Sequence, residues 1–307
     1  MIEHFGIVAE QVMILFILIA VGYFCNKKGL LSKEANKKIS DLVVLIVAPC
    51  VIILSFERSY TPELLKNFGI AILIAAAAHI LMAVTAHFLL RDRDALKRRV
   101  YLFGAVFSNA GFIAIPLQSA LLGEEGVFYG AAYLVVFNIM MWSYGVVLMS
   151  GNTNRISPKK ILLSPGIIGV AVGLVLFLGS VRLPMLIHRP MEYLAGLNVP
   201  LPMLVVGYYL ADTDLKKAFS DKKSYGCMLL RLLVYPLAAF GILYACGVRG
   251  ALLTSMVISL SAPVGATVTM FSEKFDNDTN LSVQLVSLST LLSMLTMSVI
   301  VALAHMV

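Results

Sequence analysis

Long apolar runs make up most of this chain, and each is close to the length that crosses a bilayer. An α-helix rises about 1.5 Å per residue, so about 20 apolar residues span the roughly 30 Å hydrocarbon core. Ten such runs are predicted, at residues 5–25, 39–55, 67–90, 99–120, 126–149, 163–180, 191–211, 222–246, 250–272 and 281–305. The sequence therefore predicts an all-α polytopic membrane protein with ten transmembrane helices.

The composition agrees with a membrane protein and excludes an ordinary soluble domain. Hydrophobic residues make up 60% of the chain and charged residues 13%, whereas soluble domains average roughly 25% charged residues. The loops between the apolar runs are too short to hold a further domain. The first run lacks a basic leader and a small-residue cleavage site, so we expect a retained helix and not a signal peptide.

Basic residues predict the orientation. Alternate loops, beginning with the loop after the first span, carry 18 Lys and Arg, and the opposite loops carry five. The positive-inside rule then places both termini on the extracytoplasmic side. We expect a multi-pass protein of the bacterial cytoplasmic membrane. Topology and contacts with membrane lipids account for the net charge of +7, so no nucleic-acid partner is expected.

The two halves of the chain are related by position. Residues 1–150 and 151–307 are each predicted to form five spans, so the second half starts from the opposite side and forms an inverted repeat. Matching residues lie 153 or 154 positions apart, which is about half the chain length: Pro49 and Pro202, Asn109 and Pro263, and Gly111 and Gly265.

The fourth and ninth spans contain residues that break helices. The first break is VFSNAGFIAIPL (106–117) and the second is SLSAPVGATVTMF (259–271). Unpaired backbone groups in lipid cost several kcal/mol each, so such breaks persist only against protein or a polar cavity. Paired breaks are typical of a transporter site, although small residues at kinked, packed helices are the alternative. The predicted binding residues at the breaks are Asn109, Gly111, Pro116, Pro263, Gly265 and Thr267, supported by Ser108, Ser261, Pro49 and Pro202.

Polar residues elsewhere in the spans extend this site. Arg231 could pair with a substrate carboxylate or reach the headgroups, and Asn138 could line the site or join two helices. His79 could relay protons or be a structural histidine. The tenth span carries a hydroxyl stripe, expected to contact the broken helices: Ser282, Ser289, Ser293 and Thr296.

No Asp or Glu lies in the middle of a predicted span, and such a carboxylate would be expected where a broken-helix carrier binds a cation. The interior therefore favours an anionic or neutral polar solute. The four cysteines show no metal-ligand spacing, so no metal and no cofactor is expected. The chain also lacks the phosphate-binding and hydrolase motifs of membrane enzymes and pumps. We expect no enzyme activity.

Several segments together resemble the auxin efflux carrier family, in the compact form of its prokaryotic malate or malonate permease-like branch. The resemblance covers the whole chain, and it rests on the order and spacing of four segments: residues 22–53, 108–117, 163–178 and 261–300.

The resemblance implies a fold of two inverted five-helix repeats in which helices 4 and 9 are broken and cross. It implies a scaffold of helices 1, 2, 6 and 7, a mobile transport unit of helices 3–5 and 8–10, and an elevator-like motion. The family's crossover positions fall on Asn109, Pro116 and Pro263. It also implies movement of organic carboxylates, and we expect a homodimer that forms through the scaffold helices.

The leading hypothesis is a secondary transporter, a permease or exporter, of small organic anions such as dicarboxylates. A cation-coupled carrier of the same fold, which uses Na⁺ or H⁺, is the alternative within transport. A membrane sensor that binds its ligand without moving it is the alternative outside transport.

Overall fold

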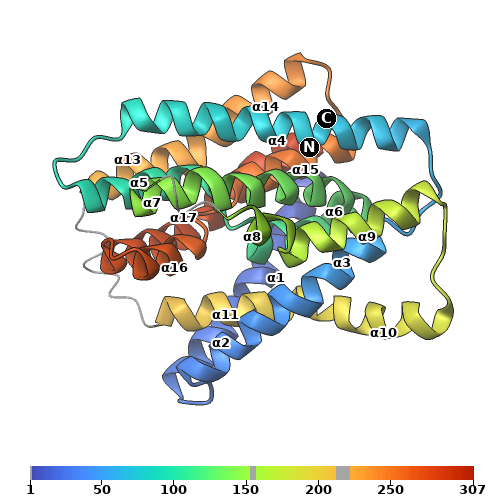
Figure 1. The fold of residues 1–307 in the computed structure, drawn as a ribbon, viewed down its shortest axis with the longest axis horizontal. Coiled ribbons are helices and arrows are strands. Elements are labelled where there is room, and N and C mark those ends of the chain that lie inside the picture. The colour runs from blue at the N-terminus through green and yellow to red at the C-terminus, as the bar shows by residue number, and fades with distance from the viewer. Residues whose placement is uncertain (1, 153–156, 212–221) are drawn as a thin grey trace.

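The structure is a computed structural model that describes residues 2–152, 157–211 and 222–307 (Figure 1). Within these ranges the regular elements are helices, and extended backbone pairs only in an isolated bridge between Ser108 and Val264. Arg155, Lys216 and Lys217, which contribute to the predicted loop charge, lie outside the described residues. The predicted class, an all-helical polytopic membrane protein, is confirmed.

The first half of the chain forms helices α1 to α7. Their bounds are α1 Ile2–Lys27, α2 Lys33–Leu42, α3 Ala48–Ser55, α4 Pro62–Leu89, α5 Ala95–Val106, α6 Ile115–Met140 and α7 Val146–Ser150. Short π-helical turns, in which the helix is widened, lie before α3, α6 and α7: η1 Val43–Val47, η2 Ala110–Ala114 and η3 Met141–Gly145.

The second half contains the remaining described helices. Their bounds are α8 Pro158–Leu162, α9 Pro165–Leu178, α10 Met185–Ala195, α11 Pro200–Ala211, α13 Lys222–Leu229, α14 Tyr235–Ala245, α15 Gly250–Ser261, α16 Thr267–Lys274 and α17 Thr279–His305. A 3₁₀ turn, η5 Gly196–Asn198, joins α10 to α11, and a π-helical turn, η6 Leu230–Val234, joins α13 to α14.

Seven helical stretches among the described residues are long and apolar enough to cross a membrane: Glu10–Lys27, Lys33–Ser55, Pro62–Leu89, Ala110–Ser150, Met185–Ala211, Lys223–Ala245 and Thr279–His305. The apolar helices Pro165–Leu178 and Gly250–Ser261 are shorter. This number differs from the predicted ten for three reasons. The predicted span 163–180 forms a helix of only 14 residues, Pro165–Leu178. The predicted span 250–272 is interrupted after Ser261, and Ala110–Ser150 runs through two predicted spans, of which 99–120 is itself interrupted. Within Ala110–Ser150, Gly123 leaves the helical conformation (φ 62°, ψ −147°), which glycine adopts at little cost.

Side-chain caps define several of the helix starts. Ser32, Thr61, Asp94 and Asp278 precede α2, α4, α5 and α17, and each accepts a hydrogen bond from a backbone N–H in the first turn. The first N–H groups of a helix have no partner within it. A short polar side chain at this position satisfies one of them, so these residues set the helix starts.

Three of the π-helical turns lie directly before a proline. η1 ends two residues before Pro49, η2 two before Pro116 and η6 two before Pro236. Proline has no N–H and its ring clashes with the carbonyl four residues back. A widened turn accommodates both effects without ending the helix. Pro49 and Pro116 therefore reshape their helices without breaking them, and Pro236 does the same next to Arg231.

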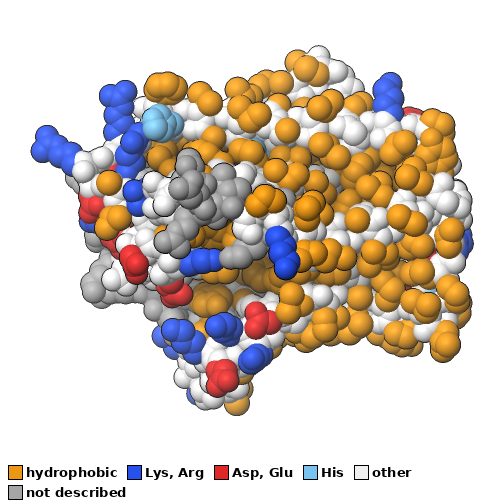
Figure 2. All heavy atoms as spheres, viewed as in Figure 1, with side chains coloured by type: hydrophobic (Ala, Val, Ile, Leu, Met, Phe, Trp, Pro, Cys, Tyr) orange, Lys and Arg blue, Asp and Glu red, His pale blue; other side chains and the backbone are white. Residues whose placement is uncertain are grey.

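The surface carries a broad apolar band (Figure 2). Large side chains such as Leu73, Val175 and Leu295 are each at least 70% exposed. Most of the Lys, Arg, Asp and Glu side chains in this view gather toward one end of the molecule. Such a wide exposed apolar surface fits lipid and not water.

Candidate site at the crossing of two broken helices

The two breaks predicted from the sequence meet at one place. α5 ends at Val106 and α15 ends at Ser261, and the residues that follow are extended. Asn109 N donates to Pro263 O (2.7 Å) and Gly265 N donates to Phe107 O (3.0 Å). Each break therefore supplies hydrogen-bond partners that the other lost when it left the helix, as backbone at membrane depth requires.

The first break is capped by its own side chain. The Oδ1 atom of Asn109 accepts a hydrogen bond from Phe112 N (3.3 Å), and its carbonyl accepts from Ile113 N and Ala114 N. Asn109 is thus the N-cap of η2, a position that asparagine favours. Its backbone (φ −78°, ψ 58°) lies outside the helical region, so the chain changes direction at this residue.

The second break is held by neighbouring segments. Val264 N donates to the hydroxyl of Ser289 on α17 (3.1 Å). A Cβ atom placed on Gly265 would lie 2.8 Å from Ser108 O and 3.2 Å from Phe107 O. Only glycine therefore lets the two backbones approach this closely.

Arg231 joins the C-terminal ends of both interrupted helices. Its side chain is 0% exposed, so it does not reach the headgroups. From the first helix it contacts Ala105 O (3.4 Å) and Val106 O (3.3 Å). From the second it donates to Ala262 O (3.0 Å) through Nε and to Leu260 O through Nη2. Unpaired carbonyls and the negative end of the helix dipole both favour a cation there.

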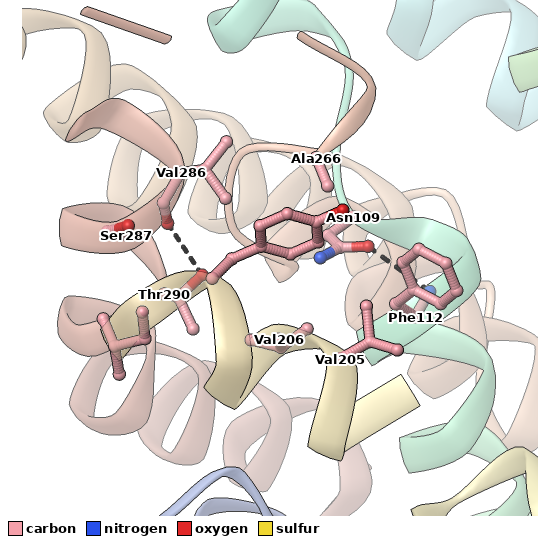
Figure 3. Close-up of a pocket in the computed structure, with 10 residues that line it drawn as sticks. Asn109, Phe112, Val205, Val206, Ala266, Val286, Ser287 and Thr290 are labelled. Atoms are coloured by element: carbon pink, nitrogen blue, oxygen red, sulfur yellow. Dashed lines mark hydrogen bonds between the residues drawn. The ribbon is translucent and has the colours of Figure 1, made fainter. Parts of the chain in front are cut away.

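A small pocket lies beside the crossing (Figure 3). Asn109, Phe112 and Ala266 line it from the two breaks, and the rest of the lining comes from two further helices. α11 supplies Val205, Val206, Tyr209 and Leu210, and α17 supplies Val286, Ser287 and Thr290. The cavity volume is about 10 Å³, which is about the room that one water molecule needs.

The polar atoms available at this pocket include hydrogen-bond donors. Asn109 is 4% exposed, and its Nδ2 has no hydrogen-bond partner among the described residues. The hydroxyl of Thr267, one residue past Ala266, also has none there. Both residues stand at the start of a helical segment, where backbone N–H groups and the dipole favour negative charge. Among the described residues that line the pocket there is no Asp or Glu.

The other residues predicted at the breaks have separate surroundings. Ser108 exchanges a hydrogen bond with the hydroxyl of Tyr133 (3.2 Å), and Ser261 donates to Val257 O within α15. Gly111 is exposed, and a Cβ atom placed on it would meet open space. Pro116 lies in the first turn of α6.

Asn138 and His79 lie away from the pocket lining. Asn138 Nδ2 donates to Leu134 O (2.8 Å) in its own helix. His79 Nδ1 lies 2.8 Å from Ala75 O, so this nitrogen carries the hydrogen, and Nε2 has no partner among the described residues. The histidine ring packs against Tyr133, whose ring centre is 5.0 Å away. Pro49 and Pro202 lie in α3 and α11.

Several residues of the site were not singled out from the sequence. The α11 side of the pocket, including Tyr209, gave no signal beyond an apolar run. Gln118 was also missed, although it is fully buried and donates through Nε2 to Ser255 and Ser259 of α15. An uncharged polar residue in the middle of an apolar run, facing serines four residues apart, is a signal that could have identified this contact.

Similarity to known proteins agrees with this architecture. A family model described as a membrane transport protein matches residues 7–159 and 151–301. An uncharacterised transporter of Methanothermobacter thermautotrophicus is 26% identical over 293 residues, which cover 94% of this chain and 95% of the relative. An uncharacterised transporter of Methanocaldococcus jannaschii is 22% identical over 295 residues, which cover 93% and 95%.

Helical spans and interrupted helices that meet inside the molecule define an integral membrane protein of the transporter class. The chain belongs to the membrane transport protein family of auxin efflux carriers, as its resemblance to that family predicted.

Proposed function

We propose that this protein is a secondary transporter of small organic anions, such as dicarboxylates, and that the anion binds at the crossing of the two broken helices. The observation that carries the proposal is the Nδ2 of Asn109, which is buried at a helix start and has no hydrogen-bond partner among the described residues, in a pocket whose described lining contains no carboxylate. A buried donor without a partner is costly, and an incoming carboxylate would supply the acceptor.

The size of the pocket argues for movement during transport. A volume of about 10 Å³ is too small for a dicarboxylate, so binding requires the walls to separate. α11 forms one wall, and the crossing together with α17 forms the other. We propose that the unit carrying the crossing slides past α1, α2–α3, α9 and α10–α11 in an elevator-type alternating access.

Two close helix contacts support the proposed inverted repeat of ten spans. α1 packs on α11, where a Cβ on Gly207 would lie 2.0 Å from Ile19 O. α9 packs on α3, where a Cβ on Gly173 would lie 2.7 Å from Phe56. If the halves are inverted repeats, the first helix of each half contacts the second helix of the other half. Small residues permit such contacts in membranes.

We also propose the membrane in which the protein lies and its orientation there. We place it in the cytoplasmic membrane with both termini outside, because Lys and Arg are concentrated in alternate loops. The gathering of charged side chains toward one end of the molecule supports this orientation (Figure 2).

The test is counterflow of labelled malonate or succinate in liposomes that contain the purified protein. Asn109→Ser keeps an oxygen that can cap Phe112 N but removes the Nδ2 donor. Asn109→Asp keeps the cap and adds a negative charge. A hydrogen bond to a charged group contributes about 1.5–3 kcal/mol, so we expect Asn109→Ser to raise KM by about 10-fold or more. Asn109→Asp should abolish transport.

Ser298→Ala is the control, because its hydroxyl donates to Met294 O within α17 and it is not among the pocket residues. It should transport as the unmodified protein does. Wild-type rates in Asn109→Asp, or a folded wild-type protein that exchanges no organic acid, would contradict the proposal.

A further inference from the structure

Arg231 has an unusual environment for a charged residue inside a membrane protein. It is wholly buried, and among the described residues no ion pair joins it to a carboxylate. Among the described residues, the titratable groups that interact with it belong to Tyr133, Tyr235, Cys227 and His79, and none of these is a carboxylate. A buried charge is normally stabilised by a charged partner, so its counter-charge must come from elsewhere.

The ends of α5 and α15 supply that counter-charge. The C-terminal end of a helix carries roughly −0.5 of an elementary charge. Two such ends meet at Arg231 and together provide roughly −1, which balances one guanidinium. Its N–H groups point to Ala105 O, Val106 O, Leu260 O and Ala262 O, with Met82 Sδ as a fifth neighbour at 3.5 Å.

This arrangement has the chemistry of a cation site. Backbone carbonyls are ligands that hard cations accept. In carriers with broken helices, unwound carbonyls and the C-terminal ends of half-helices coordinate the coupling cation. Here the guanidinium of Arg231 already donates to those carbonyls and lies in the negative potential of the two helix ends. A second cation at the same place would be repelled and would find its ligands occupied.

We propose that Arg231 is a built-in substitute for a coupling cation, so that the crossing is assembled without bound Na⁺. The inference deepens the proposed transport function and rests on it for the identity of the transported anion. Whether Arg231 takes the place of a cation can be tested separately from transport. Arginine suits this role because its planar group has five donors and stays charged when buried. Arg231 acts as a positioning residue, since it holds both half-helices while Asn109 faces the pocket.

The experiment measures the midpoint of thermal unfolding of the purified full-length protein. Wild type should show the same midpoint in NaCl, KCl and choline chloride at equal ionic strength. Arg231→Ala should unfold at a lower temperature and should regain at least about 2 °C when 10 mM methylguanidinium or NaCl replaces choline chloride. Arg231→Met, which fills the space with an apolar side chain, should be destabilised without responding to either cation.

Arg231→Lys is the conservative variant and keeps the test informative if Arg231→Ala does not fold. It retains the charge with fewer donors, so it should fold, stay indifferent to Na⁺ and keep a measurable part of the transport rate. Two results with wild type would overturn the inference: stabilisation by Na⁺, or transport that depends on Na⁺. Two results with the variants would also overturn it: equal stability of Arg231→Met and Arg231→Lys, or an Arg231→Ala protein that folds but does not respond to either cation. If a cation restores the stability of Arg231→Ala but the wild-type protein moves no organic anion, the proposed function is refuted and the inference about Arg231 is not.

Discussion

The two helix breaks occupy matching places in the two halves of the chain, yet they are stabilised differently. The break after α5 is capped locally, because Asn109 accepts a hydrogen bond from Phe112 N three residues later. In the described part of the chain, the break after α15 has no side-chain cap at the start of α16. Val264 N instead depends on Ser289 of α17, and Gly265 lies against the backbone of the first break.

This difference indicates that the two breaks have different roles at the site. The first break presents an amide donor to the pocket, and its flanking Gly111 is exposed with free space beside it. The second break supplies the close contact and the carbonyl that accepts from Asn109 N. One break therefore carries most of the predicted binding chemistry, and the other fixes the distance at which the two breaks cross.

The largest expected effect is a loss of transport when Gly265 is substituted, whereas substitution of Gly111 should have little effect. Gly265→Ala should force the breaks apart, because its Cβ would lie 2.8 Å from Ser108 O, closer than backbone atoms tolerate. We expect transport in liposomes to fall by at least about 10-fold, which corresponds to about 1.4 kcal/mol. Gly111→Ala is the matched control and should stay within about twofold of wild type, since its methyl group meets open space. Equal losses in the two variants would remove the distinction between the breaks.

The next effect concerns the support of the second break by α17. Ser289→Ala leaves the buried Val264 N–H without its acceptor, and an unpaired buried donor costs about 1–3 kcal/mol. We expect a lower midpoint of thermal unfolding and reduced transport. Ser293→Ala removes a hydroxyl one turn away that donates to Thr290 O within the helix, so it should have the smaller effect. A larger effect at Ser293 would show that α17 supports the crossing by another contact.

A smaller effect is expected at the proline that follows the first break. Pro116→Ala restores an N–H in the first turn of α6, so the widened turn η2 can relax toward a regular helix. The protein should fold with nearly unchanged stability, while KM for the transported anion rises about threefold because Asn109 shifts, an effect of roughly 0.7 kcal/mol. Counterflow at several substrate concentrations measures this, and an unchanged KM would show that η2 does not position Asn109.

The smallest effect is expected at the ends of the helices, where Asp92, just before α5, pairs with Lys223 in the first turn of α13 (2.6 Å). The hydrogen bond from Lys223 holds the pKa of the Asp92 carboxyl below its usual range. A carboxyl with a lowered pKa in the folded state contributes stability above its ordinary pKa of about 3.9, and this contribution is lost as the pH falls through that value and below.

Lys223 is largely exposed, so solvent screening should keep the contribution of this pair under about 1 kcal/mol. Asp92→Asn should therefore lower the unfolding midpoint slightly at pH 7 and make a smaller difference near pH 3. A difference that grows as the pH falls would contradict the assignment.

Much of the helical layout could be predicted from the sequence, because lipid requires each span to satisfy its own backbone. The predicted spans 67–90 and 281–305 correspond to α4 Pro62–Leu89 and α17 Thr279–His305. Glycine and proline inside apolar runs indicated where α5 and α15 end. The prolines themselves were harder to interpret, since Pro49 and Pro116 widen a turn whereas Pro263 lies in extended backbone between two helices.

The candidate site could be predicted only in part. Asn109 and Gly265 were identified because their residue types are out of place in a membrane helix. The roles of Arg231 and Asn138 stayed open, since spacing along one helix does not tell which neighbour a long or forked side chain reaches. The α11 wall of the pocket was missed, because Val205 and Val206 look like any other apolar surface until a second helix faces them.

The sequence by itself determined that this chain spans a membrane, and it marked the two places where helical hydrogen bonds must fail. Hydrophobicity and backbone chemistry act locally, so both can be seen in a single segment. Only the tertiary structure decided that the two breaks hydrogen-bond to each other and that Arg231 neutralises the ends of both interrupted helices. It also decided that Asn109 Nδ2, which has no partner in the described part of the chain, lies at a pocket lined by α11. The contacts between the two breaks join residues more than 100 positions apart, and their energies depend on distances that no single segment contains.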